Sequence, residues 1–486
     1  MTGEMAMRWP GRAVRRLDAA LGPGGLRDAS VLAAVFVISR VAAVLAGVAF
    51  ETGPLQASIQ NIDPALLRTH LLQSLWYLHG QPPLWNLLVG LSLKALPSAW
   101  PTFWHLAYMV MGFIQGQALL RLLRLLGAGR RTGLTVAALV TAFPATIAFE
   151  NSFSYDYPTF VLATLVPLAA ARFVQRPTFG RGLTSFSLAA ALVLLRTLFQ
   201  AWWIVAVVAI MLLACARHRR VVLVAAALPL ALVAGVYAKN WLMYDVAGTT
   251  SWTGMGLARS VVVGLPLSER RALVAEGKLH RVSLVKPFSP LADYLAVGVT
   301  PARPTGIPIL DEATGPEFPI NMENKTFIAI SRQYWQDDLW IVRHRPASYL
   351  GAIRRALGDF FSSATSGWEG HGNVARLGGY NRFVDEAAYG QLGLGRVGLF
   401  GVIAYLLAIG AGLVAIVRRL RQDASAAMVA TAVALVTILN VVVVGNLAEV
   451  GENYRFRFVI DPLALALATV GARELLVRLR SQRRAV

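Results

Sequence analysis

The sequence predicts an all-α, polytopic membrane protein with about ten transmembrane helices, interfacial helices in the first outer loop and a small, mainly helical outer domain. Composition is the first observation: 56% of the 486 residues are hydrophobic, only 15% are charged, and the mean hydropathy is +0.55. Soluble domains carry about 25% charged residues. The second observation is a series of apolar runs that approach the roughly 20 residues needed to cross a bilayer. The third is the placement of short arginine clusters between them.

The apolar runs set the predicted spans. They lie near residues 29–50, 101–120, 133–149, 157–171, 183–197, 199–216, 221–238, 397–417, 425–446 and 458–477. Arginine clusters precede the first run and follow the second, fourth, sixth, eighth and tenth runs. With ten spans, every cluster falls on one side of the membrane. Because cytoplasmic loops are rich in Arg and Lys, this pattern predicts that both termini are cytoplasmic.

One apolar segment, residues 82–97, does not fit as a span. It is short, and counting it would invert every later loop and put the arginine clusters outside. We therefore expect an interfacial or re-entrant helix that starts at Pro82 and Pro83, where proline is tolerated.

These assignments give four regions. Residues 1–28 form a cytoplasmic segment, which is polar and basic and does not resemble a cleavable signal peptide. Residues 29–239 form a membrane module with spans 1–7 and the outer loops that carry the candidate site. Residues 240–396 form an extracytoplasmic domain, which contains an amphipathic stretch from Thr326 to Leu357. Residues 397–486 hold spans 8–10 and a basic tail.

Several functional classes lack support. The formal charge is +20, but the arginines sit between apolar runs, where they fix topology, so we do not expect nucleic-acid binding. The single cysteine, Cys215, excludes an intramolecular disulfide. No P-loop, dinucleotide fingerprint, HExxH or GxSxG motif is present. We expect no cofactor, although a metal site among Asp63, His70 and His79, which share one loop, stays open.

Acidic residues on the predicted outer loops are the first candidates for a site. Asp63 has two interpretations: an N-cap before Pro64 at the first helical position, or a general base held over a membrane cavity. Glu150 and Asp156 flank the segment SFSYDYP after the third span. They are either solvated loop acids or parts of a substrate site.

Basic residues at the same face are the second set of candidates. Arg196 lies near the outer end of its apolar run, where it can reach an anionic headgroup. Arg455 and Arg457 lie in GENYRFRFVIDP at the mouth of the last span, either as a belt anchor or as bidentate phosphate ligands. Lys239 and His79 are further candidates; for a lone histidine such as His79, a structural role is the alternative.

The predicted arrangement of spans and outer loops resembles the membrane-embedded GT-C glycosyltransferases. The nearest resemblance is to the protein mannosyltransferase and aminoarabinose transferase group. The stretch from Asp63 through LHGQPPLWNLL and the terminal NYRFRFVIDP carry the resemblance. Pro64 follows Asp63 where the group often has Glu, and the outer domain is inserted between spans rather than placed after the last.

The resemblance implies transfer of a sugar from a polyprenyl-phosphate donor to a glycan, lipid or protein acceptor on the outer face of a bacterial inner membrane. Asp63 would be the catalytic base. The implied substrate-binding residues are Glu150, Asp156, His79, Arg196, Lys239, Arg455 and Arg457. Three alternatives stay open: a transporter or flippase for lipid-linked saccharides, an O-antigen ligase-like or polymerase-like transferase, and a non-catalytic scaffold.

Overall fold

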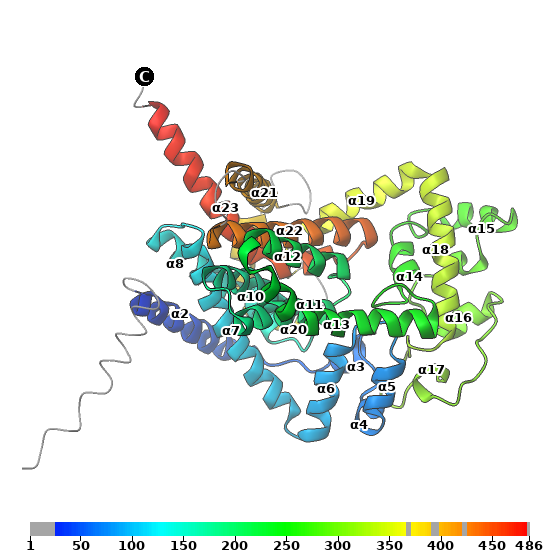
Figure 1. Ribbon diagram of the computed structural model, residues 1–486. Coiled ribbons are helices and arrows are strands. Elements are labelled where there is room, and N and C mark those ends of the chain that lie inside the picture. Colours follow the sequence, from blue (N-terminus) through cyan, green and yellow to red (C-terminus); the bar gives the residue numbers. More distant parts are fainter. Residues whose placement is uncertain (1–24, 366–370, 390–397, 420–424, 484–486) are drawn as a thin grey trace, which may run out of the picture.

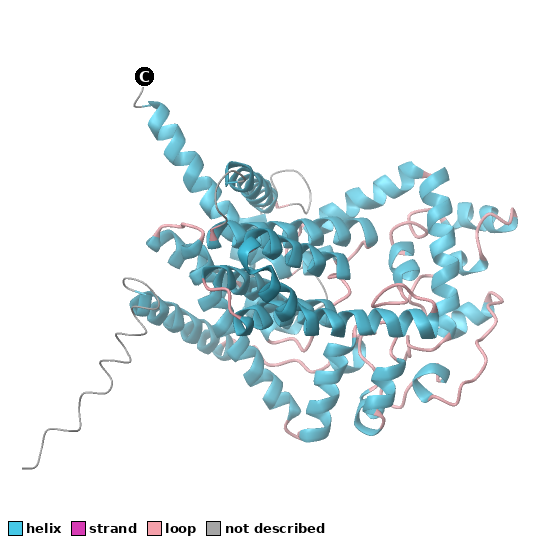
Figure 2. Cartoon of the chain, in the orientation of Figure 1, coloured by secondary structure: helices cyan, strands magenta, loops and turns pink. Residues whose placement is uncertain are grey.

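The described part of the chain consists of helices joined by loops (Figure 2). The computed structural model describes residues 25–365, 371–389, 398–419 and 425–483. Within these ranges the only β-type pairing is an isolated bridge between Glu51 and Ser152. The N-terminal arginines predicted to be cytoplasmic lie outside the described residues. The all-α prediction is therefore confirmed for the described chain.

Six described helices are long and apolar enough to cross a membrane, so the chain is a multi-pass membrane protein. A seventh span results if α8 and α9, which are bent by 49° at Pro144, count as one. Two apolar helices, α11 and α12, are shorter, and α23 carries charges in its first turns. Each of the ten predicted runs thus coincides with a helix or a bent helix pair. The six long helices are α2 (Gly25–Leu45), α7 (Trp100–Leu125), α10 (Asp156–Gln175), α13 (Arg219–Tyr244), α21 (Leu399–Arg419) and α22 (Ala426–Ala448); the others are α8 (Arg130–Ala142), α9 (Pro144–Glu150), α11 (Phe179–Leu195), α12 (Ala201–Ala214) and α23 (Asn453–Arg483).

Helix α10 is the centre of the bundle (Figure 1). It packs against α7, α11, α22 and α23. Aromatic and branched side chains along its whole length are buried, including Phe160 and Phe173. A helix that is apolar on every face suits a position surrounded by other helices. Its first residue, Asp156, is thereby held inside the protein at the end of the bundle that faces the outer domain.

The arginine clusters meet at the opposite end of the bundle. Arg124 at the end of α7 and Arg130 at the start of α8 both pair with Asp28 at the start of α2, the latter at 2.9 Å. Arg473 of α23 donates to the backbone carbonyl of Gly127 in the loop between α7 and α8. The C-terminal half of α23 also extends away from the bundle at this end (Figure 1). The clusters therefore share one end of the molecule.

The first loop folds into four short helices beside the bundle: α3 (Pro54–Ala57), α4 (Pro64–Thr69), α5 (Leu71–Tyr77) and α6 (Pro83–Ala95). The segment set aside as a non-span is α6, and Pro82 and Pro83 stand at its N-terminus as expected. Its 13 residues are too few to cross a bilayer at about 1.5 Å per residue. The helix packs on α4, α5 and α11.

The segment predicted to be extracytoplasmic, which keeps the name outer domain for that prediction, has a hydrophobic core of its own, separate from that of the bundle. Its residues, among them Met255, Phe327 and Tyr334, come from α14 (Thr253–Ala258) to α18 (Thr326–His344). These helices lie together at the end of the molecule away from the arginine clusters (Figure 1). The smaller helices in between are α15 (Leu267–Ala275), α16 (Leu291–Ala296) and α17 (Pro308–Asp311).

The amphipathic stretch from Thr326 to Leu357 is two helices rather than one. It breaks at Arg345, before Pro346, because the residue that precedes a proline is driven out of the helical region. Helix α18 stays in the outer domain, whereas α19 (Pro346–Phe360) packs on α22 and α23. Helix α20 (His371–Tyr389) contacts α9 and α21. Helices α19 and α20 therefore lie against the bundle.

Candidate functional site

A polar cavity of about 400 Å³ lies between the bundle and the outer domain. Seven separate parts of the chain line it: the first loop, the turn before α6, the residue before α10, the segment that follows α11, the segment from the end of α13 through α14, Phe288, and the turn between α22 and α23 with its flanking residues. The lining residues used below are Gln60, Gln81, Tyr155, Arg196, Gln200, Ala247, Thr250, Trp252, Arg259, Glu449, Glu452, Arg455 and Phe456.

The floor of the cavity is an ion-paired triad. Asp156 pairs through Oδ1 with Arg196 and through Oδ2 with Arg455, whose Nη2 is 2.7 Å away. All three side chains are at most 4% exposed. Asp156 is the first residue of α10 and Arg196 follows the last residue of α11, so each charge complements a helix dipole. The structure brings together these three predicted site residues.

Aromatic rings fix the Arg196 guanidinium in this position. Its central carbon is 5.1 Å from the ring centroids of both Tyr155 and Phe456. A guanidinium over aromatic faces is attracted by their π-electrons, and more strongly where water is excluded. Arg196 is thus a rigid wall of the cavity.

A more accessible set of charges forms the rim. Arg259, which follows α14, pairs with Glu449 and lies 3.6 Å from Glu452. Glu452 also accepts a hydrogen bond of 2.6 Å from Arg455. Arg259 and Glu449 are each 29% exposed, so this pair can exchange partners with a ligand more easily than the buried triad. None of Arg259, Glu449 and Glu452 was among the predicted site residues.

The two rim carboxylates differ in proton affinity. Burial raises the pKa of Glu449 and outweighs the opposite effect of nearby arginines, chiefly Arg259; the charge of Glu452 adds to the rise. For Glu452, burial also opposes ionisation, but Arg455 and Arg259 outweigh it and lower the pKa. Glu449 is therefore the better proton acceptor among the cavity carboxylates at neutral pH.

An apolar pocket of about 410 Å³ adjoins the polar cavity on the outer part of α13. Tyr237, Trp241 and Leu242 line it, and Ala247 borders both spaces. The Tyr237 hydroxyl donates to Gln200, which lines the polar cavity, at 2.6 Å. Trp241 and Leu242 are 62% and 83% exposed on a helix long enough to span the membrane. Together the two spaces suit a ligand with a charged head and an apolar tail.

Asp63 occupies a cap position beside this cavity. Its Oδ1 accepts from the amide of Ala65 at 2.7 Å, and its Oδ2 accepts from the amide of Glu317 at 3.0 Å. It is 6% exposed and is the N-cap of α4, with Pro64 at the first helical position. Asp63 does not line the cavity, whereas Gln60, three residues earlier, does. The N-cap interpretation is confirmed, and the catalytic one stays a prediction.

Glu150 pairs with Arg40 inside the bundle. The two groups form a bidentate pair at 2.8 and 2.7 Å, and Glu150 also accepts from the Tyr157 hydroxyl at 2.5 Å. Glu150 and Arg40 are 1% and 5% exposed. This is a fully paired ion bridge between α2 and the end of α9, away from the cavity lining.

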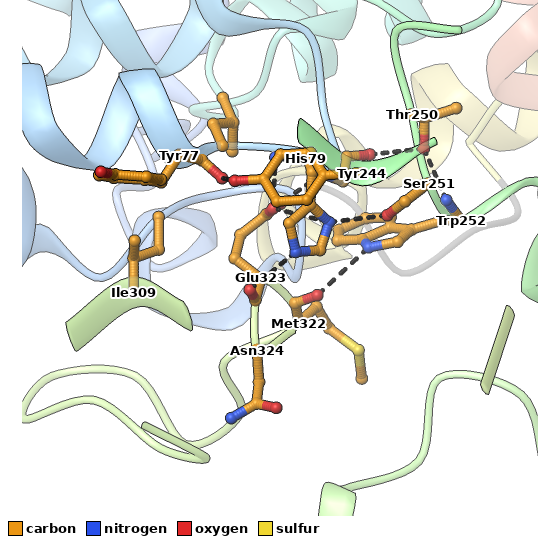
Figure 3. A network of polar contacts seen from close by, with 12 residues as sticks. Tyr77, His79, Tyr244, Thr250, Ser251, Trp252, Ile309, Met322, Glu323 and Asn324 are labelled. Atoms are coloured by element: carbon orange, nitrogen blue, oxygen red, sulfur yellow. Dashed lines mark hydrogen bonds and ion pairs between the residues drawn. The ribbon is translucent and has the colours of Figure 1, made fainter. Parts of the chain in front are cut away.

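His79 lies in a polar network that joins the first loop to the outer domain (Figure 3). Its Nε2 lies 2.9 Å from the Glu323 carbonyl, so this nitrogen carries the proton and Nδ1 accepts from the Ser251 hydroxyl at 2.7 Å. The Glu323 carboxylate in turn accepts from the amides of His79 and Gly80. Thr250, which lines the cavity, donates to the Gly80 carbonyl at 2.6 Å. His79 therefore positions the cavity wall.

Burial shifts both titratable groups of this network toward their neutral forms. It lowers the pKa of His79 to about 3, and it raises the pKa of Glu323 to about 7. Lys239, another predicted site residue, donates from Nζ to the backbone carbonyl of Leu78 beside this network. Glu323 was not predicted as a site residue, because no local pattern distinguishes it within a long polar segment.

Arg457 lies outside the cavity. It is 1% exposed, and its Nη1 donates to the carbonyls of Phe360 and Ser362 at 3.0 and 2.6 Å. Its Nε is 3.3 Å from Asp461 one turn later in α23. These contacts fasten the end of α19 to α23, so Arg457 supports the wall that carries Arg455.

No group of three or more His, Cys, Asp or Glu side chains is arranged to hold a metal ion among the described residues. No protein-family model, curated protein or solved structure matches the chain. The fold and the site define a helical multi-pass membrane protein with a charged cavity at one end of its bundle.

Proposed function

We propose that the protein is an integral membrane glycosyltransferase that transfers a sugar from a polyprenyl-phosphate donor to an acceptor on the outer face of the cytoplasmic membrane. In this proposal the bundle has ten spans of GT-C type, and both termini and the arginine clusters are cytoplasmic. The observation that carries it is the adjacency of the arginine-lined cavity and the apolar pocket on α13.

The donor would lie across both spaces. Its isoprenoid chain would follow Tyr237, Trp241 and Leu242, and its phosphate would enter the polar cavity. The described charges there are balanced, with three arginines facing three carboxylates. An incoming phosphate therefore has to displace a carboxylate, and Glu449 on Arg259 is the most exposed of the three. Arg259 and Arg455 would then hold the phosphate through forked hydrogen bonds.

This exchange gives Glu449 a catalytic role. Once released from Arg259, its carboxylate would accept the proton of the acceptor hydroxyl as that oxygen attacks the anomeric carbon of the sugar. The bond between the anomeric carbon and the phosphate oxygen breaks, and its electron pair stays on the polyprenyl phosphate. The arginines stabilise this charge. Asp63, whose two oxygens accept backbone hydrogen bonds, would position the loop that carries Gln60.

Turnover by the purified protein tests the proposal. Polyprenyl-phosphate sugars of several kinds are supplied in lipid nanodiscs, and release of polyprenyl phosphate is measured with candidate acceptors. We expect release by the wild type, a loss of about 100-fold or more in Glu449→Gln with donor binding retained, and weaker donor binding in Arg259→Gln. Glu269→Gln, which changes an exposed carboxylate of the outer domain, is the matched control.

Two results would overturn parts of this assignment. Near-normal turnover in Glu449→Gln with none in Asp63→Asn would return the role of base to Asp63. Movement of the donor across the bilayer without sugar transfer would make the protein a transporter of lipid-linked saccharides.

A further inference from the structure

A second groove lies at the arginine-rich end of the bundle, at the ends of α10 and α11 opposite to those that adjoin the outer cavity. It has a volume of about 540 Å³ and runs between the last turns of α10 and the first turns of α11. Leu165, Leu168 and Leu188 line its apolar part, and Arg172, Arg181 and Thr184 line its polar part. None of these residues lines the outer cavity.

The arginines of this groove have no acidic partners in the described part of the chain. No carboxylate in the described ranges forms an ion pair with Arg172 or Arg181. Arg121 of α7 is close enough to Arg172 for their like charges to interact, and it too has no ion pair within those ranges. The neighbouring arginines 124 and 130 differ, because they share Asp28. The groove therefore has uncompensated positive charge.

The geometry also holds one arginine in place. Nη1 of Arg181 donates to the backbone carbonyl of Arg172 at 3.0 Å, which bridges the two helix ends. Both side chains remain exposed. A guanidinium that is already oriented loses less conformational entropy when it binds an anion. The apolar residues extend from this point along helices that lie within the bundle.

We propose that this groove binds one anionic phospholipid of the adjacent leaflet. The lipid phosphate would lie between Arg172 and Arg181, and an acyl chain would follow Leu165, Leu168 and Leu188. Arginine forks phosphate oxygens, and basic residues near a bilayer surface attract anionic lipids. A zwitterionic lipid offers the same phosphate but brings a cation to a site that is already positive. The groove should therefore select phosphatidylglycerol over phosphatidylcholine.

Native mass spectrometry of the full-length protein with these two lipids tests the proposal. We expect phosphatidylglycerol to remain bound where phosphatidylcholine does not, and the double variant Arg172→Gln, Arg181→Gln to weaken its retention about tenfold. The matched control is Arg219→Gln, Arg220→Gln, which removes two exposed arginines from the start of α13. It should leave retention unchanged. Leu188→Trp, which fills the apolar part and keeps both arginines, should also weaken retention.

Three outcomes would overturn the proposal. Equal losses in the two arginine double variants would show diffuse attraction to the whole basic end. Equal retention of both lipids would show an apolar surface without headgroup selection. Displacement of phosphatidylglycerol by glycerol 3-phosphate at similar concentrations would show a site for small phosphates, because the acyl chain would then contribute nothing.

Discussion

Asp156 is the residue on which the outer cavity is built. It is buried at the start of α10 and pairs with Arg196 and Arg455, which come from different parts of the bundle. Its loss would leave these two buried guanidinium groups to repel each other. Charged residues inside apolar runs are rare, because each one costs free energy in lipid. This is why Arg196 stood out in the sequence, whereas Asp156 and Arg455 were singled out by their positions just outside predicted spans. The sequence could not reveal their mutual contacts, which join residues about 40 and 300 positions apart.

A substitution of Glu150 tests whether this predicted site residue has a structural role. Replacing it with Gln removes the charge opposite Arg40, so we expect the free energy of unfolding to fall by about 3–5 kcal/mol, the usual cost of breaking a buried ion pair. Chemical unfolding in mild detergent measures this loss. Glu269→Gln breaks an exposed pair with Arg345 and should cost about 1 kcal/mol or less. Equal effects of the two variants would contradict the structural role of Glu150.

Because the pKa of Glu323 is raised, we expect the contact between the first loop and the outer domain to depend on pH. Its pKa is raised to about 7 from the ordinary 4.5, so between pH 5 and 7 the folded protein keeps a proton that the unfolded chain releases. Its contribution to stability should therefore be largest below about pH 4.5 and decline by up to about 3 kcal/mol as the pH rises through 7. Thermal unfolding of the wild type and of Glu323→Gln at each pH measures this difference.

The wild type has to be compared with Glu323→Gln, because the pKa of His79 is shifted in the opposite direction from that of Glu323. Its pKa is lowered to about 3, so acid below about pH 6.5 favours the unfolded chain, in which the histidine protonates. Both proteins contain His79, and the difference between them isolates Glu323. A difference that stays constant from pH 5 to pH 8 would refute the assignment.

At the scale of the helices, close approach of α14 to α18 holds the outer domain together. Gly254 lies against the backbone carbonyl of Ser331 and the amide of Trp335, so an added methyl group meets backbone that has no room to move. We expect Gly254→Ala to destabilise the outer domain by about 1–3 kcal/mol. Limited proteolysis of the outer domain measures the effect.

Gly256 provides the control within the same helix. A methyl group there has open space around it, and both substitutions raise helix propensity equally. Gly256→Ala should therefore retain or increase protease resistance. If both variants behave alike, the close contact between α14 and α18 does not limit stability.

Helix boundaries show what could be predicted locally and what could not. The start of α6 was predicted correctly from Pro82 and Pro83, because proline constrains only the backbone next to it. Hydropathy alone gave one run at 133–149, and it missed the bend at Pro144 that turns α9 away from α8. The roles of Arg259 and Glu323 were also missed. Both lie in the long segment between the seventh and eighth predicted spans, where no local pattern singles them out. Packing of the outer domain brings Arg259 to the cavity and Glu323 to the backbone of His79 and Gly80.

At the scale of the whole molecule, described arginines of the clusters, among them Arg124 and Arg130, lie at one end, and the outer domain lies at the other (Figure 1). The positive-inside rule predicts that the arginine end is cytoplasmic. Cysteine labelling tests this orientation in a Cys215→Ala background. Lys278→Cys, exposed in the outer domain, should react with a membrane-impermeant maleimide in intact cells. Thr178→Cys, exposed between α10 and α11, should react only after the membrane is opened. The reverse pattern would invert the proposed topology.

The central claim is that the outer cavity and the pocket on α13 together bind a polyprenyl-phosphate sugar. Photo-crosslinking with a donor that carries a diazirine near the phosphate end of its isoprenoid chain tests this most directly, with the modified residues identified by peptide mass spectrometry. We predict labelling within residues 237–247 of α13 and the loop that follows, and its loss in Arg259→Gln or on competition with unlabelled donor. Labelling spread over the lipid-facing helices, unaffected by the variant and the competitor, would contradict the account.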